Sequence, residues 1–209
     1  MKDFSVSMAI VDYIPVILFA VAAVLLMRDL YNKMSKGAFA LFAAGVIDIV
    51  CAGALKATYK LLYASGACDF EALNAMFFPV QSIGFLLAGI GIIAMLCHKQ
   101  SVTCAVVPPV FTGTFVFVGL MVAGLGLMDV ALCILAVKLK KPAFIALFVV
   151  SFICSLCMGY LSSQDFAQAS MNWIAEGVNV IGQGTLFAGV WLMHKKGLCD
   201  LKLCDGKAQ

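Results

Sequence analysis

The sequence predicts an all-α polytopic membrane protein, and three observations carry this prediction: composition, an internal repeat and the distribution of basic residues. Of the 209 residues, 64% are hydrophobic and only 12% are charged, and the mean hydropathy is +1.06. Soluble globular chains are about half apolar and about one quarter charged. Outside the apolar runs, the longest polar segment is the tail 195–209. The expected surroundings of the chain are therefore a lipid bilayer.

An internal repeat divides the chain into two similar halves. Residues 74–84 match residues 172–182 without gaps at an offset of 98, and residues 40–55 match residues 146–161 at an offset of 106. The two matches occur in the same order in both halves. Each half also contains three apolar segments, which lie at 14–30, 38–62 and 74–97 in the first half and at 119–139, 143–161 and 172–193 in the second.

The stretch between the two halves is itself apolar. It continues into the next segment and gives one run over residues 102–137, which would measure about 54 Å as a single helix at about 1.5 Å per residue. A bilayer core is only about 30 Å thick. We therefore expect a turn near residues 118–126 and a separate linker helix before it.

These features predict seven transmembrane helices in a 3+1+3 arrangement of two parallel three-helix repeats. The expected units are a first repeat (1–100), a linker helix (101–118), a second repeat (119–194) and a cytoplasmic tail (195–209). The alternative is six helices in two inverted three-helix repeats.

Basic residues favour the parallel arrangement. Seven spans with the N-terminus outside place eleven of the 14 Lys and Arg on the inner side, whereas six spans place ten there. The equivalent turns of the two halves, at Lys36 and Lys141, are both basic, and inverted copies should differ in this respect. The expected location is the cell membrane, with the N-terminus outside and the C-terminus in the cytoplasm.

The last apolar segment carries a polar stripe. Asn172, Glu176, Asn179 and Gln183 follow one another at spacings of four, three and four, so they share one face of a helix. A stripe that contains a carboxylate should face the protein interior or a water-filled path. The repeat aligns Asn74 with Asn172 and Gln81 with Asn179. We expect these six residues to bind a substrate.

Three acids lie deep within predicted spans: Asp48, Asp129 and Glu176. Intramembrane acids are rare, and they often serve proton or cation coupling. No Lys or Arg lies at a comparable depth in the sequence, because Lys56 and Lys60 fall near the outer end, where their stems can snorkel. The predicted interior is therefore acidic, which favours a cationic or neutral hydrogen-bonding solute.

Other chemistry finds little support in the sequence. No catalytic motif is present, so we expect neither an enzyme nor a cofactor. Cys199 and Cys204 are two thiols without histidine partners, which is insufficient for a structural zinc site. His98 and His194 are expected to be solvated interfacial residues. The net charge of +3 gives no indication of a nucleic-acid partner.

The 3+1+3 arrangement resembles that of the SWEET and PQ-loop transporters and, more distantly, that of the microbial rhodopsins. The sequence Pro79-Val80-Gln81 differs from the adjacent proline–glutamine pair of the former families. Residues 182–185 read Gly-Gln-Gly-Thr and provide no lysine for retinal. The resemblance is therefore one of architecture, and no family residue is transferred.

The leading hypothesis is a small transporter of a polar small molecule, with a central site between the two repeats. The alternative is a membrane-embedded sensor or partner-binding subunit that uses the polar face of the last helix. Either protein could form a homo-oligomer or associate with a membrane partner.

Overall fold

The computed structural model describes residues 5–97, 114–161 and 169–202, and every regular element in these ranges is helical. The predicted all-helical architecture is therefore confirmed for the described residues. The α-helices are α1 (Val6–Val11), α2 (Tyr13–Leu30), α3 (Lys36–Ala64), α4 (Glu71–Ala75), α5 (Phe77–Leu96), α6 (Thr114–Lys138), α7 (Ile145–Leu161) and α8 (Ala169–Lys195). Three short 3-10 helices cover Tyr31–Lys33, Pro142–Phe144 and Leu198–Asp200.

Several helices are long and apolar enough to cross a membrane. By length and composition they are Val6–Lys33, Lys36–Ala64, Glu71–Leu96, Phe117–Lys138 and Pro142–Leu161. The helix α8 is comparably long, at 27 residues, but carries the polar stripe. These helices are compatible with the predicted integral-membrane location.

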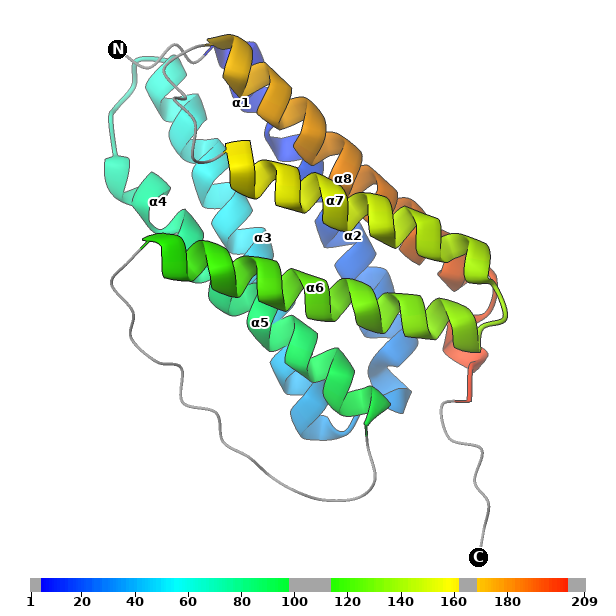
Figure 1. Ribbon diagram of the computed structural model, residues 1–209. Coiled ribbons are helices and arrows are strands. Elements are labelled where there is room, and N and C mark those ends of the chain that lie inside the picture. Colours follow the sequence, from blue (N-terminus) through cyan, green and yellow to red (C-terminus); the bar gives the residue numbers. More distant parts are fainter. Residues whose placement is uncertain (1–4, 98–113, 162–168, 203–209) are drawn as a thin grey trace, which may run out of the picture.

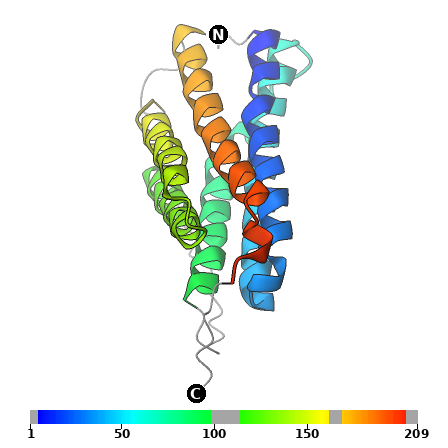
Figure 2. The ribbon, with the colours of Figure 1, turned by 90° about the vertical axis from the view of Figure 1, so that its right-hand side faces the viewer.

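The helical bundle has two different ends (Figure 1). One end, which we call the basic end, contains the α2–α3 and α6–α7 connections and the end of α8. The helices α2, α5, α6 and α8 run toward the basic end, whereas α3 and α7 run away from it. Figure 2 shows α8 between α2 and α7. The basic residues that lie in or beside these connections are Arg28, Lys33, Lys36, Lys138, Lys140, Lys141, Lys195 and Lys196.

Local signals in the sequence fix the limits of α3. The Ser35 hydroxyl accepts a hydrogen bond from the Ala38 backbone N–H at 3.2 Å and caps the start of the helix. The helix then continues for 29 residues until the chain turns at Gly66, whose φ of +70° suits glycine. Lys60 therefore lies within α3, one turn before the helix ends at Ala64.

The helix α6 corrects one sequence prediction. It continues without a break from Thr114 to Lys138, so the turn expected near residues 118–126 is wrong. The glycines in this stretch are helical, and Gly124 brings α6 against the backbone of Leu86 in α5. At 25 residues, α6 measures about 38 Å, which is sufficient for a single span. Most of the predicted linker helix (101–118) lies outside the described residues.

Helix packing follows the same pattern in both halves of the chain. In the first half α3 packs on α5, and in the second α7 packs on α8; between the halves, α2 packs on α8 and α6 packs on α5. A Cβ atom added at Gly84 would lie 3.0 Å from Cβ of Asp48. One added at Gly182 would lie 2.9 Å from Cβ of Cys154. Gly84 and Gly182 are 98 residues apart, and Asp48 and Cys154 are 106 residues apart, which are the offsets of the predicted repeat.

A second pair of glycines behaves in the same way. A Cβ atom added at Gly91 would lie 2.9 Å from Cβ of Phe42. One added at Gly189 would lie 2.7 Å from ring atoms of Phe148. Gly91 and Gly189 are again 98 residues apart, and Phe42 and Phe148 are 106 residues apart. Glycine is therefore required where α5 meets α3 and where α8 meets α7.

Much of the buried apolar core lies in the half of the bundle next to the basic end. It includes side chains from the last turns of α2, α5, α6 and α8 and from the first turns of α3 and α7: Leu26, Leu30, Phe42, Ile92, Met95, Leu132, Leu135, Phe148, Val190 and Met193. All of these are at most 4% exposed. This half is therefore closed by close-packed apolar side chains.

Gly124→Ala tests the close approach of α5 and α6. The new methyl carbon would lie 2.5 Å from the Leu86 backbone nitrogen, so we expect a loss of about 1–3 kcal/mol of unfolding free energy. Gly119→Ala is the control, because nothing lies within 4 Å of its added carbon. Thermal unfolding in detergent would show the difference, and equal stability of the two variants would contradict this packing.

Candidate functional site

A cavity of about 490 Å³ lies in the half of the bundle away from the basic end. It is lined by the N-terminal halves of α2, α5 and α6, by the middle and C-terminal parts of α3 and α7, by Asn74 of α4, and by α8 from Asn172 to Gln183. All six predicted substrate-binding residues line it: Asn74, Gln81, Asn172, Glu176, Asn179 and Gln183. Helical periodicity therefore located the residues that surround one cavity, although it does not show what they bind.

Three buried charged groups meet at the cavity. The Lys60 ammonium lies 2.8 Å from Oδ2 of Asp12 and 2.5 Å from Oε1 of Glu176. The three side chains are only 5–7% exposed. Lys60 comes from α3, Glu176 comes from α8, and Asp12 sits at the junction of α1 and α2. We call Asp12, Lys60 and Glu176 the ion trio.

A second lysine also lines the cavity. Lys56 lies one helical turn before Lys60, and its ammonium is 4.1 Å from the centre of the Phe77 ring. An ammonium over an aromatic face is stabilised by the ring quadrupole. No ion pair of Lys56 occurs within the described residues. Its positive charge is therefore available to the cavity.

These two lysines correct the prediction of an acidic interior without a base. That prediction is wrong because α3 turns Lys56 and Lys60 inward instead of letting them snorkel to the outer surface. A signal was present in the sequence: the spacing of four places both lysines on one helical face. Asp12, which lies just before the first apolar segment, is a further site residue that the sequence pattern did not predict.

The other two acids lie elsewhere. Asp48 is half-buried in α3, with its Cβ near Gly84, and it does not line the cavity. Asp129 in α6 is 4% exposed, and neither carboxyl oxygen has a hydrogen-bond partner among the described residues. The structure therefore does not gather Asp48, Asp129 and Glu176 into one acidic site.

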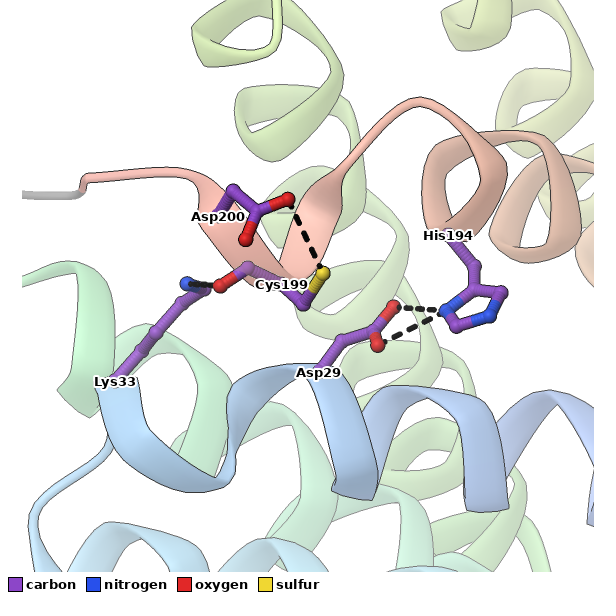
Figure 3. A network of polar contacts seen from close by, with 5 residues as sticks. All are labelled: Asp29, Lys33, His194, Cys199 and Asp200. Atoms are coloured by element: carbon purple, nitrogen blue, oxygen red, sulfur yellow. Dashed lines mark hydrogen bonds and ion pairs between the residues drawn. The ribbon is translucent and has the colours of Figure 1, made fainter.

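A separate polar network closes the basic end (Figure 3). Nδ1 of His194 lies 2.9 Å and 2.8 Å from the two carboxyl oxygens of Asp29, whose side chain is fully buried. The Lys33 ammonium donates to the Cys199 carbonyl at 2.6 Å. The expectation that His194 is simply solvated is therefore wrong, because it joins the end of α8 to the end of α2. His98 lies outside the described residues.

The described residues hold no cluster of three metal-binding side chains. Desolvation, together with the nearby carboxylates of Asp200 and Asp29, raises the pKa of the Cys199 thiol. A raised thiol pKa disfavours the thiolate that binds soft metals. Cys204 lies outside the described residues.

Comparison of the chain with protein-family models, with curated proteins and with solved structures found no match. The resemblance to SWEET and PQ-loop transporters therefore remains an architectural expectation.

Lys60→Met tests the ion trio. This change leaves two buried carboxylates without their counter-ion, so we expect the unfolding free energy to fall by about 3–5 kcal/mol. The neutral triple variant D12N/K60M/E176Q should recover most of this loss, because no unpaired charge remains. Unfolding of the purified proteins in detergent would measure both effects. A triple variant less stable than Lys60→Met would contradict the electrostatic explanation.

Asp129→Val tests the second buried acid. Removing a carboxyl group that lacks hydrogen bonds should raise the unfolding free energy by about 1–3 kcal/mol. The same unfolding assay measures it. A clear loss of stability would instead show that Asp129 is bound by a partner beyond the described residues.

Proposed function

We propose that the protein is a small membrane transporter and that a polar small molecule binds in the cavity. The observation that carries this proposal is the concentration of amides, carboxylates and lysines around one cavity within otherwise apolar helices. Polar groups are costly in such surroundings, and they usually mark a substrate or ion path. A volume of about 490 Å³ lies within the range of small-molecule sites.

The proposal includes two parallel three-helix copies with the site between them. Its support is the equivalence of Gly84 and Gly182, and of Gly91 and Gly189, in their contacts. The helix directions also agree, because α2, α3 and α5 run in the same successive senses as α6, α7 and α8. Transporters built from repeats commonly bind their substrate at the repeat interface.

The two halves of the bundle have roles in this mechanism. In this proposal the cavity opens to the end away from the basic end, and the apolar core and the Asp29–His194 contact seal the other half. Transport requires the seal to open while the cavity mouth closes. Two contacts join a helix of the first half to α8: the Lys60–Glu176 ion pair on the cavity side and the Asp29–His194 contact at the basic end. Each is therefore placed to stabilise one of two states, one closed on the cavity side and the other closed at the basic end.

Glu176 is the central residue of the proposed site. One oxygen binds Lys60, and the other, Oε2, is buried without a hydrogen-bond partner among the described residues. It can therefore bind a donor group of the substrate or exchange a proton during transport. Gln81, Asn179 and Gln183 supply further hydrogen bonds from the cavity wall.

The alternative of a sensor or partner-binding subunit is less well supported. It requires the polar face of α8 to be presented to another helix. That face instead lines the cavity of its own chain, and Asn172 and Glu176 are each 4% exposed.

Uptake into proteoliposomes tests the proposal. The purified protein would be assayed with a panel of labelled amino acids, amines, polyols and sugars, against protein-free vesicles. We expect at least one solute to accumulate, and Glu176→Gln to reduce its uptake by at least about tenfold while Glu71→Gln, an exposed acid outside the cavity, leaves it unchanged. Absence of uptake for the whole panel would refute transport of such solutes.

A further inference from the structure

We propose that the ligand of the cavity is a zwitterion of the amino-acid class, with its carboxylate at Lys56 and its ammonium at Glu176 and Gln183. This inference rests on the proposed function and specifies its substrate. It follows from two sets of unpaired polar atoms in one cavity and from the charge balance between them.

The first set consists of acceptors on α8. Oε2 of Glu176 and Oε1 of Gln183 are both buried and lack hydrogen-bond partners among the described residues. The two residues are seven positions apart, so they lie two turns apart on one face, and both line the cavity. Buried acceptors are nearly always satisfied in folded proteins. A ligand ammonium, with its three N–H donors, supplies what these oxygens lack.

The second set is the donor on α3. Lys56 lines the same cavity and forms no ion pair within the described residues, whereas its neighbour Lys60 is held by two carboxylates. The Phe77 ring stabilises the ammonium but accepts no conventional hydrogen bond from it. A carboxylate of the ligand would satisfy this charge.

The charge balance selects between ligand classes. The cavity contains two carboxylates, Asp12 and Glu176, and two ammonium groups, Lys56 and Lys60. A purely cationic ligand would leave Lys56 unpaired, and a purely anionic ligand would leave Glu176 Oε2 unsatisfied. A zwitterion pairs both ends and keeps the filled site neutral, which matters because unpaired charges are costly away from water.

The apolar part of the ligand also has a place. Phe19, Phe78 and Phe85 line the cavity beside the charged groups. Cavities that combine apolar walls with a few fixed polar groups obtain orientation from the polar groups and affinity from the walls. An amino compound with an apolar side chain therefore fits better than a polyol.

Thermal unfolding of the full-length protein in detergent tests the inference, because ligands that bind the native state raise its unfolding temperature. The probes are the standard L-amino acids and γ-aminobutyrate. Each stabilising probe would be compared with its decarboxylated amine and its deaminated acid, for example leucine with 3-methylbutylamine and 4-methylpentanoate. We expect the zwitterion to bind at least about tenfold more tightly than either analogue.

Variants of Lys56 then assign the carboxylate end. Lys56→Met should raise the dissociation constant of the zwitterion by at least about tenfold and leave that of the amine nearly unchanged, and Lys56→Arg should restore part of the loss. Lys36→Met, an exposed residue of the same helix at the basic end, is the matched control. Equal losses for zwitterion and amine would overturn the assignment of Lys56.

The outcomes separate this inference from the proposed function. Binding and uptake of an amine or a polyol in preference to every amino acid would overturn the zwitterion and leave transport intact. Binding of an amino acid without any uptake would support the ligand class and refute transport. Absence of binding and uptake for all solutes would refute both.

Discussion

The Lys60 ammonium, held between Asp12 and Glu176, is the interaction on which the rest of the site depends. Charges taken out of water need partners, and these three come from the α1–α2 junction, from α3 and from α8. Their pairing brings three helices of both halves together around a polar space. Asn172, Asn179 and Gln183 lie on the same face of α8 as Glu176 and therefore line that space as well. The pairing thus offsets the cost of burying three charges and holds their side chains at the cavity.

The bundle is divided along its length. Toward the basic end the helices meet through close-packed apolar side chains and through Asp29 and His194. Toward the other end the same helices separate around polar groups. Glycines at Gly91 and Gly189 permit the close contacts of the first region. This division is what the proposed transport function requires of one state, in which one half is sealed by close packing and the other surrounds a cavity.

Part of this site could be predicted from the sequence because helical periodicity is local. The spacing of Asn172, Glu176, Asn179 and Gln183 defined one polar face, and that face lines the cavity. Lys60 was misplaced because its depth alone does not tell which way it points; its direction depends on Asp12, which is distant in the sequence. The expected turn near residues 118–126 failed because Gly124 serves helix packing against α5 rather than chain reversal.

The most direct test of this account is the water accessibility of the two halves. In a variant whose nine native cysteines are replaced by alanine, Ser155→Cys places a thiol on the cavity wall, and Ala136→Cys places one in the apolar core, where the native residue is 0% exposed. A membrane-impermeant thiosulfonate should modify the residue-155 thiol only from the side opposite the basic end, and the residue-136 thiol from neither side. Modification of residue 155 from the basic side alone, or of residue 136, would contradict the account.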